Sequence, residues 1–188
     1  MVDIQTISIA IASGSVVLAA IYYILQLRHQ ITIRKTDLLI RLYSTMSSSE
    51  FLDAEWKILS LQVKDYQDYV RQYGSLFSEN PMHKALALVA SFYELLGNLL
   101  LRKLVDIGSV YDVMGSNTPK MLYEKIKPVV LGARRETNEP FVFAGFEYLC
   151  DELVRKEPQL RKTWAKATST SNEMKKKEQQ LQAGAKNG

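Results

Sequence analysis

An uncharged stretch of twenty-four residues, from Ile4 to Leu27, constrains this chain more than any other feature of its sequence. At about 1.5 Å per residue, a helix of this length reaches roughly 36 Å, enough to cross a hydrocarbon core of about 30 Å. Residues 1–3 are acidic, and the apolar stretch is longer than that of a secretory signal peptide. We therefore predict a transmembrane helix over 4–27, in preference to a cleaved signal or an amphipathic surface helix.

The charges around this stretch predict its orientation. Arg28, Arg34 and Lys35 follow the span, whereas no cation precedes it, and cytoplasmic flanks carry the excess of Lys and Arg. Tyr22 and Tyr23 suit the inner membrane interface, where an aromatic ring has an apolar body and a hydrated hydroxyl. We expect a single-pass protein of the cell membrane, with its N-terminus outside, its domain in the cytoplasm and the lipid bilayer as its first partner.

The remaining charges are divided unevenly along the chain. Residues 42–154 carry eleven cations and fifteen anions, whereas residues 155–188 carry nine cations and three anions. The high isoelectric point therefore comes from the tail and does not indicate a nucleic-acid-binding face on the domain. The single cysteine, Cys150, excludes an intramolecular disulfide framework and is expected to be buried.

The pattern after the span is helical throughout, and no segment alternates as a strand would. We predict an all-α fold in which the transmembrane helix continues into a juxtamembrane stalk over 28–47. A cytoplasmic bundle of about five or six helices follows over 48–167. Beyond it, residues 168–188 are rich in Ser, Thr, Lys, Gln and Gly, a composition that predicts a disordered basic tail.

One apolar seam begins the bundle, with residues spaced alternately four and three apart. It could form one helix ending at Gly74, or two shorter helices separated near residues 64–65, because Asp65 can cap a helix. We favour packing within the bundle over an intermolecular coiled coil, and treat the seam as a possible interaction surface. Its members are Leu52, Trp56, Leu59, Val63, Tyr66, Val70 and Tyr73.

A second apolar segment, residues 85–101, contains Glu94 as its only charge. A charge at the centre of a membrane span costs about 2.5–3.5 kcal/mol even on insertion scales. A helix that is apolar on all sides otherwise forms the centre of a globular bundle. We therefore predict a core helix preceded by Asn80 as its N-cap and Pro81 at its first position.

Motifs for chemistry are scarce in this sequence. His29 and His83 have no cysteine or carboxylate at metal-ligand spacing, and both are expected on the surface. The sequence contains neither a phosphate-binding glycine loop nor a GxSxG elbow. We therefore predict no metal, no cofactor and no catalytic residue.

Charged residues in apolar surroundings are the best remaining candidates for a site. A buried carboxylate must be paired, hydrogen-bonded or protonated, so we predict that Glu94 pairs with Arg134 inside the bundle, with Glu147 nearby. A pair that fixes helix register is favoured over a catalytic or ligand-binding acid.

Four short motifs carry a resemblance to a known family, together with the N-terminal span and Arg134. They are Tyr93-Glu94-Leu95-Leu96-Gly97, Leu104-Val105-Asp106, Lys127-Pro128-Val129-Val130 and Phe146-Glu147-Tyr148-Leu149. Over roughly residues 5–157 the chain resembles an uncharacterised, domain-of-unknown-function family of small membrane-anchored helical proteins from bacteria and archaea. Members often carry tryptophan before the Lys-Pro segment, where this chain has Tyr123. The resemblance implies the anchor and the all-helical fold, and it implies no known reaction.

These features predict a non-catalytic interaction or scaffold module that holds a protein partner, or a second copy of itself, at the cytoplasmic membrane face. One alternative is an enzyme or ligand-binding domain built around Glu94 and Arg134. Another is nucleic-acid binding through the basic tail, which includes Lys175, Lys176 and Lys177. The same tail could be solvated, or could contact anionic lipid.

Overall fold

The computed structural model describes the backbone of residues 3–75 and 78–186, and the side chains of residues 3–4, 13–75 and 78–171. Within these ranges the chain forms seven α-helices and no strand, which confirms the predicted all-α class. The helices are α1 (Ile4–Met46), α2 (Ser49–Leu59), α3 (Tyr66–Tyr73), α4 (Pro81–Leu101), α5 (Ile107–Met114), α6 (Asn117–Thr137) and α7 (Ala144–Lys186).

The chain divides into two compact units, Met1–Thr45 and Met46–Gly188. The first is formed by α1, a single helix that runs without interruption through the predicted span and stalk. By length and composition, two helices could cross a membrane, and in the part of α1 from Ser13 onward the apolar window is wholly exposed. The second candidate, α4, is partly buried.

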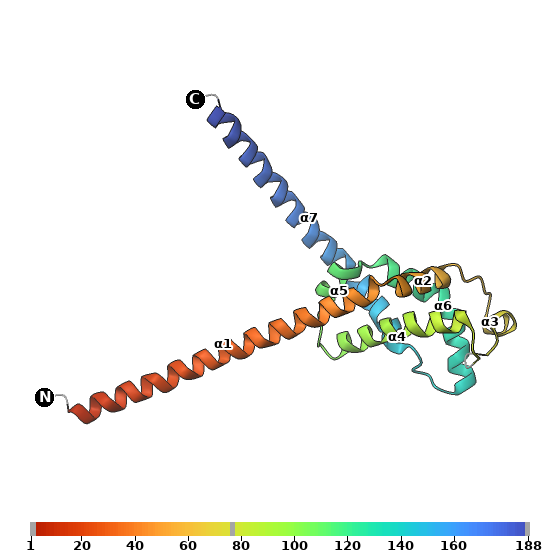
Figure 1. Ribbon diagram of the computed structural model, residues 1–188, viewed down its shortest axis with the longest axis horizontal. Helices are drawn as coiled ribbons and strands as arrows, with labels where there is room; N and C mark the ends of the chain where they lie inside the picture. Colours follow the sequence, from red (N-terminus) through yellow and green to blue (C-terminus); the bar gives the residue numbers. More distant parts are fainter. Residues whose placement is uncertain (1–2, 76–77, 187–188) are drawn as a thin grey trace. The chain divides into compact units, whose positions relative to one another are not determined.

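The second unit is a bundle of six helices, as many as the sequence predicts (Figure 1). Its central helix is α4, which packs against α2 on one side and α7 on another. Helix α6 packs against α2, α3 and α7, and α5 lies on α7. Ten residues of α4 are buried, so within the bundle this apolar helix forms the core, as its sequence predicts.

A row of five aromatic rings joins four of these helices. Phe51 of α2 contacts Phe92 of α4 edge-on, with 4.8 Å between ring centroids. Tyr93 stacks on Phe146 of α7 at 4.7 Å, and Phe146 meets Tyr123 of α6 at 5.2 Å. Aromatic pairs in these geometries contribute about 0.5–1.5 kcal/mol to stability beyond the burial of their area. The row therefore stabilises the packing of α2, α4, α6 and α7.

Helices α4 and α7 approach most closely at two glycines. A Cβ atom at Gly97 would lie only 1.8 Å from the carbonyl oxygen of Gly145. A Cβ at Gly145 would lie 2.7 Å from the carbonyl oxygen of Glu94. Both positions therefore require glycine, because the two backbones are in direct contact.

The predicted seam is interrupted, and the alternative of two shorter helices is correct. Helix α2 ends at Leu59, and Asp65 caps α3 by accepting a hydrogen bond from the amide of Asp68 at 2.8 Å. Trp56 is 71% exposed, whereas Tyr66 is buried. The buried face of α2 is a neighbouring stripe, formed by Phe51, Ala54, Glu55 and Ile58.

Residues 168–188, predicted as a disordered tail, are described as far as residue 186, and the disorder of this segment stays a prediction. Helix α7 passes through Pro158 and continues to Lys186. Pro158 removes only one amide donor, and the Glu, Lys, Gln and Ala residues that dominate residues 173–183 all have high helix propensity. A segment with too few apolar residues to form a core can still form a helix, because its residues have high helix propensity.

His83 is buried instead of lying on the surface as predicted. Its side chain is 7% exposed, and its Nδ1 donates a hydrogen bond to the carbonyl oxygen of Ser78 at 2.8 Å in the tautomer that this contact favours. The ring also lies 5.5 Å from the ring of Tyr69, between centroids. Its place in the first turn of α4 is correct, but α3 covers that turn.

Candidate interaction surface

Glu94 lies beside the first turn of α7 and accepts two hydrogen bonds there. Its Oε2 accepts from the backbone amide of Phe146 at 2.8 Å, and its Oε1 accepts from the Asn98 side chain at 3.1 Å. The first amides of a helix have no partner within the helix, and the helix dipole favours a negative charge at this end. Glu94 therefore acts as an N-terminal cap supplied by another helix.

Arg134 does not pair with Glu94, which corrects the predicted ion pair. Its guanidinium binds the Glu147 carboxylate at 2.8 Å, and its Nε donates to the carbonyl oxygen of Val142 at 2.9 Å. Arg134 thus joins the end of α6 to the turn before α7 and to the first turn of α7. The two carboxylates of the predicted cluster therefore have different partners: Glu147 binds Arg134, and Glu94 binds the Phe146 amide.

A second buried polar pair, Glu55 with Tyr93, was not predicted. The Tyr93 hydroxyl donates to the Glu55 carboxylate at 2.9 Å, across the contact between α2 and α4. Burial raises the pKa of the Glu55 carboxyl above its ordinary value, and the hydrogen bond from Tyr93 offsets part of that rise. Burial also raises the pKa of the Tyr93 phenol, so this group stays protonated as the donor.

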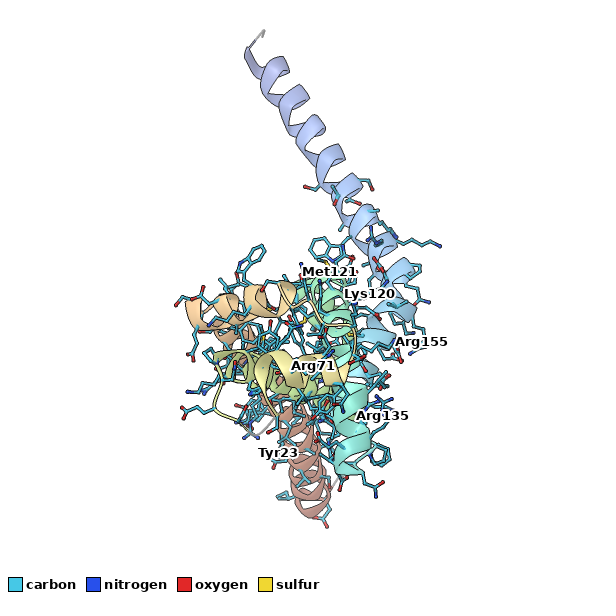
Figure 2. All side chains as sticks on the ribbon, turned by 90° about the vertical axis from the view of Figure 1, so that its right-hand side faces the viewer. Tyr23, Arg71, Lys120, Met121, Arg135 and Arg155 are labelled. Carbon is cyan, nitrogen blue, oxygen red and sulfur yellow. The ribbon has the colours of Figure 1, made fainter. Side chains whose placement is uncertain are left out.

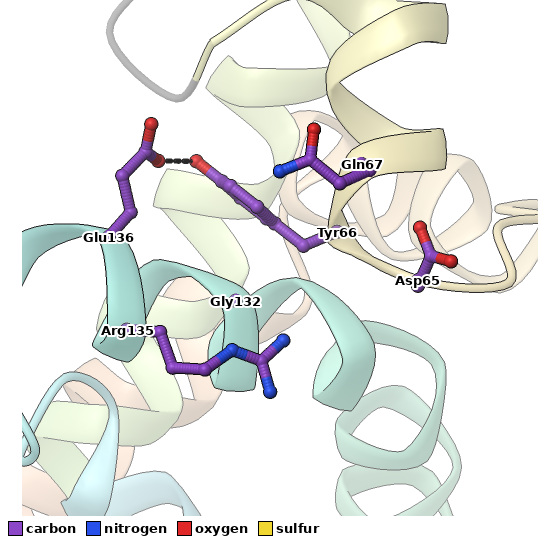
Figure 3. Close-up of a pocket in the computed structure, with 6 residues that line it drawn as sticks. All are labelled: Asp65, Tyr66, Gln67, Gly132, Arg135 and Glu136. Atoms are coloured by element: carbon purple, nitrogen blue, oxygen red, sulfur yellow. Dashed lines mark hydrogen bonds between the residues drawn. The ribbon is translucent and has the colours of Figure 1, made fainter.

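A shallow pocket of about 480 Å³ opens between α3 and α6 (Figure 3). Gly132 admits the Tyr66 ring, because a Cβ there would lie 2.0 Å from the Cβ of Tyr66. The Tyr66 hydroxyl donates to the Glu136 carboxylate, while burial and this carboxylate raise the phenol pKa to about 12. Arg135 also lines the pocket, and the described residues provide no ion pair for it. The pocket contains polar groups for recognition and no activated nucleophile.

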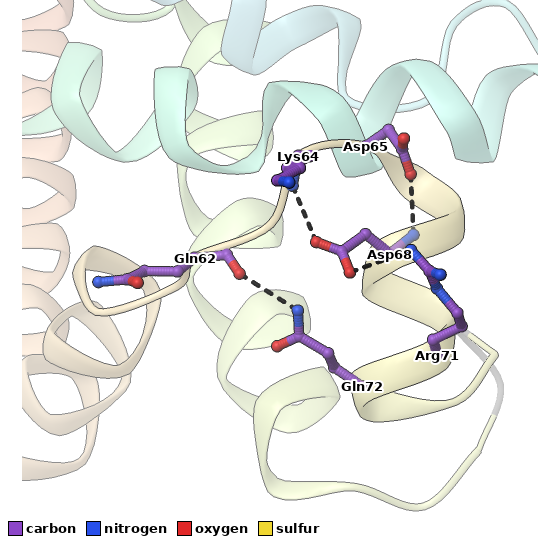
Figure 4. Close-up of polar contacts among 6 residues, drawn as sticks. All are labelled: Gln62, Lys64, Asp65, Asp68, Arg71 and Gln72. Carbon is purple, nitrogen blue, oxygen red and sulfur yellow. Dashed lines mark hydrogen bonds and ion pairs between the residues drawn. The ribbon is translucent and has the colours of Figure 1, made fainter.

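Polar contacts around Asp68 hold the short helix α3 in place (Figure 4). The Asp68 carboxylate accepts from the backbone amide of Lys64 at 3.1 Å and from Arg71 at 3.4 Å. The hydrogen bond from the Lys64 amide is the largest cause that lowers the pKa of Asp68. The Gln72 side chain donates to the carbonyl oxygen of Gln62 at 3.3 Å, which fixes the loop that interrupts the seam.

An apolar surface remains exposed where α2 meets α6. Leu52, Trp56 and Leu59 follow one another at spacings of four and three along α2, so they share one face of that helix. Leu59 also lines a hollow of about 510 Å³ together with Met121, which is 56% exposed. We call Leu52, Trp56, Leu59 and Met121 the α2–α6 surface. The other residues lining its hollow are Asn117, Lys120, Glu124 and Lys125.

The α2–α6 surface contains the first three residues of the predicted seam and adds Met121, which the sequence did not single out. Figure 2 shows Lys120 and Met121 at one end of α6 and Arg135 toward the other. The later seam residues do not extend this surface: Tyr66 packs into the core, and Val63, Val70 and Tyr73 are half-buried.

The residues predicted at the membrane interface all lie on α1. Tyr22 and Tyr23 are exposed on this helix, as are Arg28, Arg34 and Lys35. These exposed rings and cations have the composition of a membrane–water boundary.

Among the described residues, no three His, Cys, Asp or Glu side chains gather as metal ligands. Cys150 is buried as expected, and burial, followed by the nearby carboxylates, raises its thiol pKa to about 12.

Together these features define an all-helical bundle protein with an apolar N-terminal helix, in which buried and half-buried polar residues fix helix ends and helix contacts. The chain belongs to the family described as a domain of unknown function, DUF4760, whose sequence profile matches residues 10–153. This membership confirms the predicted resemblance to an uncharacterised family. Comparisons with curated proteins and with solved structures gave no match. The profile ends at Leu153, the last residue of α7 that is buried in the described part of the chain.

Proposed function

We propose that this chain is a membrane-anchored, non-catalytic interaction module that binds a protein helix on its α2–α6 surface. The observation that carries the proposal is the exposure of Trp56 and Met121 beside an apolar hollow. Contiguous exposed apolar side chains are typical of a protein interaction site, and tryptophan is enriched among the residues that dominate binding energy.

The chemistry of the surface favours a particular kind of partner. A hollow flanked by an apolar stripe accommodates the apolar face of an amphipathic helix, whose anchoring side chains recur every three or four residues. Lys120 and Lys125 line the hollow, and Glu124 is the one acid among the residues described there. An apolar face with acidic residues at its edges therefore fits better than a basic one.

The anchor in this proposal is α1, with its N-terminus outside and the bundle in the cytoplasm. Its exposed apolar stretch and the cations that follow support this arrangement. Glu94, Arg134 and Glu147 are engaged in capping and pairing, which supports a structural role for them over a catalytic one.

Photo-crosslinking in intact membranes tests the interaction. A photoreactive amino acid at position 56 should yield a discrete crosslinked protein, whereas the same residue at position 95, where Leu95 is exposed on α4, should not. Met121→Glu should abolish the product formed from position 56, because a carboxylate would be desolvated in the hollow. Leu101→Glu, at an exposed position at the end of α4, is the matched control.

A diffuse pattern from position 56, or the same product from both positions, would contradict the proposal. A product consisting of two copies of this chain would identify the partner as the protein itself.

Thiol labelling tests the orientation. The raised pKa of Cys150 leaves the native thiol unreactive at neutral pH. A Ser169→Cys variant should therefore label with an impermeant maleimide only after the cells are opened. Labelling of intact cells would place the bundle outside.

A further inference from the structure

The second half of α7 extends beyond the other helices of the bundle, in both views (Figure 1, Figure 2). We call residues 155–171 the α7 extension. Positions 161–170 are all exposed, and one side-chain contact links this stretch to another helix among the described residues: Trp164 donates from its indole to the Asp112 carboxylate of α5 at 2.8 Å.

From residue 161 to residue 170 the helix is exposed on all sides, and such a helix gains little stability from its own sequence. Isolated helices of this length are marginal in water, and the run Thr168-Ser169-Thr170-Ser171 has low helix propensity. Binding to a further surface would therefore stabilise the α7 extension.

Charge indicates the nature of that surface. The α7 extension contains five cations and one anion, and that anion, Glu157, already accepts from Arg161 at 2.7 Å. Lys162 and Lys166 are exposed and make no ion pair among the described residues. A surface of dense negative charge would complement this segment.

Of the five cations, Lys162 and Lys166 lie opposite the apolar residues of the extension, whereas Lys156 lies four residues before Leu160 and shares its side. Leu160, Trp164 and Ala167 lie at spacings of four and three, and so share one side of α7. Lys162 and Lys166 lie four apart on the opposite side. A helix with tryptophan and leucine on one face and lysines on the other is typical of helices that lie in the interface of an anionic membrane.

We infer that the α7 extension binds the anionic phospholipid headgroups of the membrane to which the chain is attached. The inference rests on the proposed membrane anchor, because attachment keeps lipid at a high effective concentration around the extension. A single amphipathic face with one tryptophan fits a lipid surface better than a nucleic acid, for which several stacking aromatics would be expected.

Fluorescence in vesicles tests the inference with the full chain. The Ser169→Cys variant, labelled with an environment-sensitive dye, is reconstituted in phosphatidylcholine vesicles or in an equal mixture of phosphatidylcholine and phosphatidylglycerol. The dye emission should shift to the blue in the mixed vesicles only, and high salt should reverse the shift because it screens the headgroups.

Lys162→Gln combined with Lys166→Gln should lower the ratio of bound to free extension about 25-fold, since each cation near an anionic surface contributes about fivefold. The matched control, Lys64→Gln with Arg102→Gln, removes the same charge from exposed positions elsewhere on the bundle and should leave the shift intact.

Equal emission in the two vesicles would overturn the inference. A shift that depends on protein density in phosphatidylcholine would overturn it in favour of self-association, and a shift that appears only with added RNA or DNA would overturn it in favour of nucleic acid. Extraction of the same vesicles with alkaline carbonate tests the membrane anchor separately. A chain without an anchor would be released from both kinds of vesicle, whereas an anchored chain whose extension does not bind lipid would stay in the membrane.

Discussion

Glu94 is a charged residue in an apolar helix whose role depends on a segment about fifty residues later. Its carboxylate completes the first turn of α7, at the point where Gly97 and Gly145 bring two backbones together. Several residues that carry the family resemblance therefore form a helix junction in this chain, and such residues indicate a fold without indicating a reaction.

Replacing Glu94 tests this capping role. Glu94→Ala should lower the free energy of unfolding by about 1.5–3 kcal/mol, because a buried amide loses a charged acceptor. Glu94→Gln keeps an acceptor oxygen and should lose only the interaction with the helix dipole, about 0.3–1 kcal/mol. Urea unfolding in detergent micelles measures both. Equal losses in the two variants would argue that the carboxylate does not cap α7.

Glu55 predicts a pH dependence of stability. Its folded-state pKa is raised, so the folded protein holds this proton more tightly than the unfolded chain does. The resulting stability is fully present below the unfolded pKa and is lost as the pH rises through the folded pKa. Glu55→Gln should remove this dependence and should be more stable than the wild type at neutral pH, with the difference closing in acid.

Unfolding free energies measured from acidic to neutral pH would check this. Tyr93→Phe provides a second test, because it removes the donor to Glu55 and should cost about 1–3 kcal/mol at neutral pH. If the unfolding free energy of Glu55→Gln changed with pH in parallel with that of the wild type, the pH dependence could not be assigned to Glu55.

At the scale of helices, the contact between α4 and α7 is the most sensitive to substitution. Gly97→Ala would place a methyl group 1.8 Å from a backbone oxygen, so the helices must separate. We expect a loss of about 3 kcal/mol or more of unfolding free energy. Gly108→Ala is the control within α5, since the nearest atom there is a side-chain oxygen of Asp106 at 3.1 Å. Comparable losses of unfolding free energy in Gly97→Ala and Gly108→Ala would contradict the close contact between the α4 and α7 backbones.

The sequence predicts individual helices better than their faces. Asn80-Pro81, Asp65 and the apolar composition of residues 85–101 specify caps and a core helix by local chemistry alone, and the structure contains them. The buried face of α2 was misjudged by one position, because Phe51, Ala54 and Ile58 form a stripe next to the seam and include Glu55. Both stripes have helical spacing, so spacing alone does not distinguish them.

The sequence also does not identify the partners of the half-buried charges on α4, α6 and α7. Arg134 binds Glu147, thirteen residues along the chain, and Glu94 binds an amide. A sequence indicates that a buried carboxylate needs a partner, but that partner can equally be a side chain or a backbone amide. Here the turn before α7 brings the Val142 carbonyl and the Glu147 carboxylate to Arg134, while the Phe146 amide binds Glu94.

At the scale of the whole molecule, the proposed function assigns to α1 the attachment of the bundle to the membrane. Val16→Arg would add a charge near the centre of the predicted span, at a cost of about 2.5–3.5 kcal/mol on insertion scales. We expect a smaller carbonate-resistant fraction in membranes, while Leu101→Arg at an exposed site on the bundle leaves that fraction unchanged. Full carbonate resistance of the Val16→Arg protein would argue against a span at this position.

The junction of α4 with α7 also has a consequence for synthesis on the ribosome. Residue 146 is made after residue 94, so a nascent chain that ends before α7 leaves the Glu94 carboxylate without the Phe146 amide, Gly97 without Gly145, and one face of the Tyr93 ring without the Phe146 ring. A chain that folds from its N-terminus therefore completes its core only when its last helix emerges. Until then the incomplete bundle leaves part of its most apolar helix uncovered, a state in which a chain is prone to aggregate.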